Sequence, residues 1–141
     1  GLGEREVVKL KSNENEKLKE QKVVSQIQNI NDNSEYLIGE WSGKMSGKNL
    51  KIVIESVEGN KIKGYNILGT NKRPLSGTFE TYTGTREDNI SANGFNLILK
   101  EPGDDKWDGV FTIDINESYP CTGVWKANNG EKTSEFTIEK K

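Results

Sequence analysis

The chain has 141 residues, with 20 basic and 22 acidic side chains and a net charge of −2. This length predicts one domain with a single core, and the balanced charge argues against a nucleic-acid partner. Histidine is absent, which removes the side chain most used for proton transfer and the commonest metal ligand, so we expect no metal site, no cofactor and no catalytic residue.

The N-terminal segment over 1–33 is a charged leader without aromatic side chains. Apolar residues from Val23 to Ile30 fall on one stripe of a helix that the spacing predicts over about 14–29. The same composition is typical of segments that stay disordered until they dock. The prediction is therefore a leader, either a flexible tether or a short docked helix, followed by a domain over 34–141.

From Tyr36 onward, apolar and polar residues alternate, and Gly, Asn and Asp clusters interrupt the alternation at short intervals. The predicted strands are 36–44, 49–57, 61–68, 74–81, 94–101, 106–115, 121–127 and 133–140. The connections are short except for 82–93, and Asn129-Gly130 favours a tight hairpin turn. The sequence therefore predicts an all-β fold, an eight-stranded antiparallel up-and-down meander barrel without long exposed edges.

The inner face of this barrel should be apolar, with a few special positions. An apolar residue, a glycine and an aromatic residue recur with the same spacing at 37–41, 75–79, 107–111 and 121–125. An inward glycine lets a small sheet coil sharply and leaves space for a neighbouring ring. Cys121 is expected to be a buried, inert thiol. Asn66 is the polar residue expected to face inward, where a backbone group, a water or a ligand must satisfy its amide.

Two short motifs resemble the start of avidin-type barrels: Leu37-x-Gly39-x-Trp41 and Ile62-x-Gly64-Tyr65. The Gly-x-Trp pair is also similar to that of lipocalins. Both families are eight-stranded meanders, so the resemblance implies this fold over about 36–140. In avidins the turn after the first tryptophan supplies an Asn and a Ser to biotin. The comparable stretch here, Ser42 to Lys48, does not carry that pair over, so biotin binding is not implied.

A small barrel behind a charged leader also resembles bacterial surface or periplasmic lipoproteins. This resemblance implies an extracytoplasmic location, with any membrane contact made through a lipid anchor upstream of residue 1. The sequence contains no run of about 18 apolar residues, so it predicts no segment that spans a bilayer.

In an up-and-down meander alternate loops lie at the same end, so the loops 44–49, 69–74, 101–106 and 127–132 should share one rim. We expect their polar side chains to lie above a floor of inward tryptophans, as in barrels that hold a ligand. The candidate ligand-binding residues are Trp41, Asn66, Lys72, Arg73, Asp104, Asp105, Trp107, Trp125 and Asn128. The alternative is a set of solvated turn charges, each worth under about 1 kcal/mol.

The expected function is that of a non-enzymatic binding or interaction domain for an unknown small molecule, glycan or protein. The alternative is a lipocalin-like carrier of a small apolar ligand inside the barrel, although the many large inward side chains favour a filled barrel. An enzyme comes third, because no nucleophile and base can be paired. The acidic segment over 100–108 lacks the spacing of a calcium loop or of a glycosidase carboxylate pair.

Overall fold

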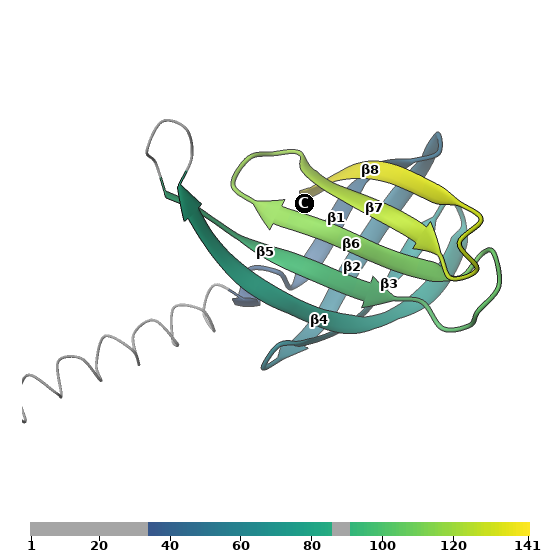
Figure 1. Ribbon diagram of the computed structural model, residues 1–141, viewed down its shortest axis with the longest axis horizontal. Helices are drawn as coiled ribbons and strands as arrows, with labels where there is room; N and C mark the ends of the chain where they lie inside the picture. The colour runs from purple at the N-terminus through teal and green to yellow at the C-terminus, as the bar shows by residue number, and fades with distance from the viewer. Residues whose placement is uncertain (1–33, 86–90) are drawn as a thin grey trace, which may run out of the picture. The chain divides into compact units, whose positions relative to one another are not determined.

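The computed structural model describes residues 34–85 and 91–141, and the unit over Tyr36–Lys141 is a closed antiparallel barrel (Figure 1). Its strands are β1 (Gly39–Met45), β2 (Lys48–Glu58), β3 (Lys61–Leu68), β4 (Asn71–Thr85), β5 (Ser91–Lys100), β6 (Gly109–Asn116), β7 (Cys121–Ala127) and β8 (Thr133–Lys140). Each strand pairs with the next, and β8 closes the sheet against β1. The predicted fold class is confirmed, whereas the leader over 1–33 and its helix over 14–29 lie outside the described residues.

Strand alternation builds the core, as the sequence predicted. β7 shows the rule most clearly, because its residues are buried and exposed in strict alternation from Cys121 to Ala127. The inward side chains of all eight strands join one buried apolar cluster, in which Trp41, Ile52 and Leu97 are fully buried. No helix in the described part of the chain is long and apolar enough to cross a bilayer.

The inward glycines allow the sheet to coil, and Gly77 of β4 shows how. A methyl group at Gly77 would lie 1.8 Å from the carbonyl oxygen of Ile98 on β5, so a larger residue would push the two strands apart. This close approach is consistent with the predicted role of the motif glycines as curvature positions.

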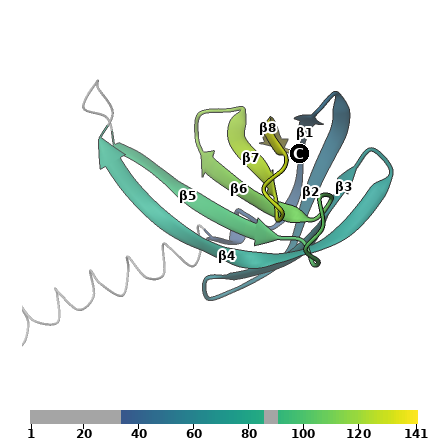
Figure 2. The same cartoon turned by 45° about the vertical axis from the view of Figure 1, so that its right-hand side comes forward.

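The connection predicted over 82–93 is corrected, because most of it is strand. β4 continues to Thr85, beyond its last pair with β3 at Thr78, and β5 begins at Ser91, before its first pair with β6 at Gly94. Figure 2 shows β4 and β5 extending side by side past the other strands. Tyr82 pairs with Gly94 across the hairpin and covers the space that a side chain there would fill. This cross-strand aromatic–glycine pair stabilises the extension, which the sequence signal of Gly and Asn residues had concealed.

Candidate functional site

Four loops gather at one end of the barrel, the end that the meander topology predicts for them. They connect β1 to β2, β3 to β4, β5 to β6, and β7 to β8. Backbone hydrogen bonds connect neighbouring parts of this end. The Gly69 N–H, between β3 and β4, donates to the carbonyl oxygen of Asn49 at the start of β2 at 2.8 Å, and the Asn128 N–H donates to the carbonyl oxygen of Asp108 at 2.8 Å. A cavity of about 660 Å³ lies among these loops. We call it the mouth cavity.

The mouth cavity combines apolar and polar side chains. Its apolar lining is Met45, Leu68, Trp107, Phe111 and Trp125. Its polar lining is Ser46, Lys48, Asn66, Thr70, Asn71, Lys72, Arg73, Glu101, Lys132 and Ser134. Of the predicted site residues, the structure therefore brings Asn66, Lys72, Arg73, Trp107 and Trp125 to one cavity.

The central polar group of the cavity is Glu101, whose side chain is only 6% exposed. Its Oε1 accepts a hydrogen bond from the indole Nε1 of Trp125 at 2.8 Å and another from the backbone N of Gly109 at 3.0 Å. Its Oε2 accepts one from Asn66 Nδ2 at 3.1 Å. All three donors are neutral, and within the described residues Glu101 forms no ion pair. A buried carboxylate is thus held by polar groups alone.

Asn66 is 2% exposed and faces inward, as predicted. Besides donating to Glu101, its Nδ2 lies 3.5 Å from the carbonyl oxygen of Arg73 on the paired strand β4. The amide expected to meet a backbone group, a water or a ligand therefore has a carboxylate as its main partner. Sequence reasoning placed Glu101 only among the rim residues, because a glutamate at the end of a strand is usually solvated.

Gly109 makes room for the indole that reaches Glu101. A methyl group at Gly109 would lie 2.5 Å from Cε2 of Trp125. This glycine, the third member of the repeated motif, thus serves the mouth cavity by allowing the Trp125 indole to pack against the start of β6.

Trp107 was predicted to face inward, but it is exposed. β6 begins at Gly109 and not near 106, so Trp107 belongs to the preceding loop and is 56% exposed. Arg73 holds this loop by donating from Nη1 to the Trp107 carbonyl oxygen at 2.6 Å and to Asp108 Oδ1 at 2.5 Å. The ammonium groups of Lys106 and Lys132 lie 5.2 and 5.7 Å from the Trp107 ring centroid. An aromatic face that attracts cations therefore borders the cavity.

The remaining loop residues of the predicted site shape the loop and do not line the cavity. Asp105 Oδ1 accepts from the backbone N of Trp107 at 2.7 Å, and Asn128 Nδ2 donates to the Gly103 carbonyl oxygen at 2.8 Å. Asp104 is exposed. Over residues 34–85 and 91–141, no group of three Cys, Asp or Glu side chains is placed to hold a metal ion.

Lys72 lines the cavity, but its ammonium lies 4.1 Å from the ring centroid of Tyr65. Leu68 and Lys132, by contrast, line the cavity without having been predicted. Their signal in the sequence was their parity with the inward residues Asn66 and Phe136, at the last residue of β3 for Leu68 and one residue before β8 for Lys132.

Trp41 is not brought to the mouth. It lies near the start of β1, at the opposite end of the barrel, where its ring is 5.8 Å from that of Tyr36 and 6.2 Å from that of Tyr119. Its Nε1 donates to the Leu37 carbonyl oxygen at 3.0 Å. The expectation that all three tryptophans lie beneath one rim was wrong for this residue, because β1 runs toward the rim and Trp41 precedes its midpoint.

This opposite end, which we call the plugged end, consists of Tyr36, Trp41, Tyr119 and Lys140. The Lys140 ammonium lies 5.1 Å from the Trp41 ring centroid and donates to the Ile38 carbonyl oxygen at 2.7 Å. Burial lowers the pKa of Lys140, and burial together with the hydrogen bond to Tyr36 raises the pKa of Tyr119. Rings and a bonded ammonium thus cover this end of the core.

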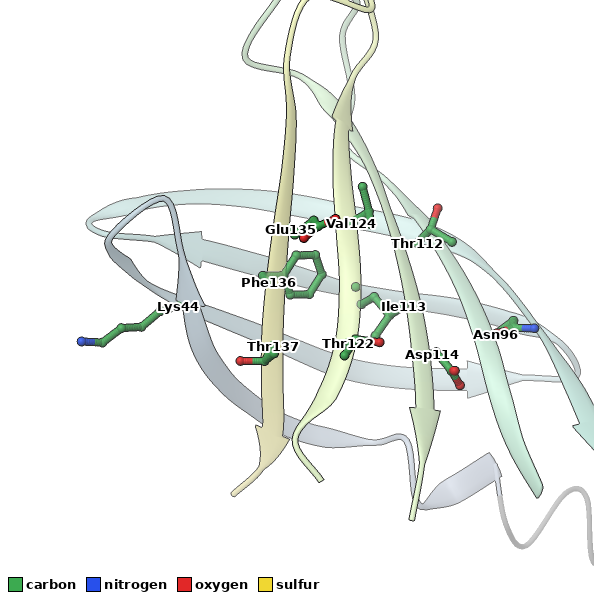
Figure 3. Close-up of a pocket in the computed structure, with 11 residues that line it drawn as sticks. Lys44, Asn96, Thr112, Ile113, Asp114, Thr122, Val124, Glu135, Phe136 and Thr137 are labelled. Carbon is green, nitrogen blue, oxygen red and sulfur yellow. The ribbon is translucent and has the colours of Figure 1, made fainter. Parts of the chain in front are cut away.

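A second hollow lies on the outer face of β6, β7 and β8 and has a volume of about 640 Å³ (Figure 3). Side chains such as Thr112, Thr122, Glu135 and Thr137 line it, and each of these is exposed or half-buried. Alternating Thr and charged residues are typical of a solvated sheet face. The mouth cavity, by contrast, contains buried polar side chains, so it is the better candidate site.

No protein-family model, curated protein or solved structure matches this chain. The resemblance to avidin-type barrels, lipocalins and surface lipoproteins therefore stays a prediction, while the eight-stranded closed barrel stands on the structure.

Proposed function

We propose that this chain is a non-enzymatic, extracytoplasmic binding domain that holds a small ligand in the mouth cavity. The observation that supports this proposal most is the cavity itself, which combines about 660 Å³ of space, two tryptophans among its apolar lining residues and a buried polar centre at Glu101 within a largely polar lining. Ligand pockets are commonly about 300–1,000 Å³ and have mostly apolar walls with a few placed polar groups.

The charged groups of the mouth support binding more than catalysis. Glu101 is held by three donors, and Arg73 is held by Asp108 and the Trp107 carbonyl oxygen. Such fixed groups orient a ligand without moving during the encounter. The buried Asn66–Glu101 pair also favours this site over a purely apolar carrier pocket, because an apolar ligand would make no hydrogen bond with the polar centre of the cavity.

A panel of sugars, fatty acids, organic amines, carboxylates and peptides tests the proposal, with binding read by tryptophan fluorescence. We expect at least one class to change the emission of the parent protein and to lose affinity when Trp107 is replaced by Ala. Ile98→Ala is the matched control, because Ile98 is 44% exposed on the outer face and lies outside the cavity. Equal loss in both variants, or binding that neither variant alters, would place the ligand elsewhere.

The extracytoplasmic part of the proposal is supported by the resemblance to tethered surface barrels and is tested separately. Cell fractionation and protease accessibility of the full-length native protein should place the barrel outside the cytoplasm. Recovery of the protein in the cytoplasmic fraction would contradict the extracytoplasmic location but not the proposed binding site.

A further inference from the structure

The burial and the hydrogen-bond partners of Glu101 suggest which chemical class of ligand the mouth cavity binds. Buried carboxylates are normally paired with a cation, because removal from water disfavours an isolated charge. Glu101 is 6% exposed, and its described partners are an amide, an indole and a backbone N–H. None of them supplies the positive charge that would balance it.

The carboxylate also has an acceptor position left. A carboxylate has about four lone-pair sites, two on each oxygen. Oε1 receives two hydrogen bonds, from Trp125 and Gly109, whereas Oε2 receives one, from Asn66. By this count Oε2 can accept one further hydrogen bond, and Glu101 is among the residues that line the mouth cavity.

The aromatic wall suits the same chemistry. Trp107 already has two ammonium groups of the chain within 6 Å of its ring centroid, those of Lys106 at 5.2 Å and Lys132 at 5.7 Å. Because these two ammonium groups already lie against the ring, Trp107 is suited to contact the apolar body of a ligand and not its positive head. A ligand that carries a positive head group next to an apolar body would contact Trp107 and Trp125 with its body and the buried carboxylate with its head.

We propose that the mouth cavity binds a protonated organic amine, whose N–H donates to Glu101 Oε2 and whose apolar body packs on Trp107 and Trp125. This inference rests on the proposed function of the mouth. Four basic side chains that line the cavity, Lys48, Lys72, Arg73 and Lys132, suggest the opposite charge, an organic anion, at first sight. Their attraction is weak because water screens exposed charges, and Arg73 already pairs with Asp108.

Three probes of one shape and different charge test this class: 2-phenylethylammonium, 2-phenylethanol and phenylacetate. Calorimetric titration of the folded protein at low ionic strength should give the tightest binding for the ammonium, by at least about tenfold over the alcohol, as a hydrogen bond to a charged group implies. Glu101→Gln should reduce this preference to within about threefold, since it keeps the size of the side chain and removes its charge.

Asp104→Asn is the matched control, because it removes the same charge from the same loop at an exposed position. It should leave the ammonium preference intact. If Glu101→Gln does not fold, the order of the three probes on the parent protein still decides. The amine inference would be overturned by equal affinity for alcohol and ammonium, by tightest binding of phenylacetate or by no binding of any probe. It would also be overturned if Asp104→Asn lost the ammonium preference as much as Glu101→Gln does. Binding of other panel members at Trp107 would still support the mouth as the site.

Discussion

The two ends of the barrel solve the problem of covering the core in different ways. At the plugged end, Trp41 is fully buried under Tyr36 and Tyr119, and the Lys140 ammonium is bonded to backbone carbonyl oxygens. At the mouth, a buried carboxylate and a half-exposed tryptophan border a cavity. The difference shows that the same kinds of side chain, tryptophan and a charged group, close the barrel at one end and border a cavity at the other.

The largest effect that separates the two ends should come from their tryptophans. Trp41→Ala should lower the free energy of unfolding by about 3–5 kcal/mol, because it opens a cavity in the packed core. Trp107→Ala should lower it by less than about 1 kcal/mol, because that ring is mostly in solvent. Urea unfolding of both variants measures the contrast. Similar losses in the two variants would mean that Trp107 is also a core residue.

Replacing Glu101 should have an intermediate effect on the free energy of unfolding. Glu101→Ala leaves Trp125 Nε1, the Gly109 N–H and Asn66 without their acceptor, so we expect a loss of about 2–3 kcal/mol. Glu101→Gln should cost about 1 kcal/mol or less, because the new amide accepts from Trp125 and donates to a flipped Asn66. A Gln variant as unstable as the Ala variant would show that the charge, and not the hydrogen-bond geometry, stabilises this end.

A smaller effect is expected for the pair of Arg73 and Asp108, which holds the Trp107 loop. The side chains are 33% and 14% exposed, so water partly screens the pair. A double-mutant cycle with Arg73→Ala and Asp108→Ala should give a coupling free energy of about 1 kcal/mol. A coupling near zero would mean that the loop is held by its backbone bonds instead.

The smallest effect concerns pH and belongs to the plugged end. Burial raises the pKa of Tyr119 above its ordinary value of 10.0, so the folded state retains a proton that the unfolded chain loses. Stability should therefore be full below pH 10 and fall as the pH rises above it. Tyr119→Phe should flatten this alkaline decline in thermal unfolding. Burial lowers the pKa of Lys140, so this residue changes stability with pH in the opposite direction. Its effect is present in both the parent and the Tyr119→Phe protein, so it does not contribute to the difference between them. An identical decline in both proteins would contradict the assignment to Tyr119.

Much of the fold followed from the sequence because strand alternation is a local signal. The period of two predicted the inward faces, with Asn66 as an inward amide, and the short connections predicted the strand order and the loops that share the mouth. Trp107 and Trp41 were placed wrongly for a different reason. Where a strand begins, and how far along it a ring lies from an end, depend on cross-strand pairing that a repeated motif does not report.

Glu101 was not predicted from the sequence to be a buried site residue. Its burial depends on donors from β3, β6 and β7, which are far apart in the chain and meet only when the barrel closes. The signal that could have found it is parity, because Glu101 continues the inward series of Leu97 and Leu99. A charged residue at an inward position is informative whenever the strand before it is regular.

Fluorine NMR of the protein labelled with 5-fluorotryptophan tests most directly whether the mouth is the binding end. The three tryptophans report on separate places: Trp41 on the plugged end, Trp125 on the floor of the mouth cavity and Trp107 on its border. On titration with the tightest binder of the ligand panel, we predict that the resonances of Trp107 and Trp125 shift while that of Trp41 stays in place. A shift confined to Trp41, or no shift at Trp107 and Trp125 at saturation, would contradict binding at the mouth.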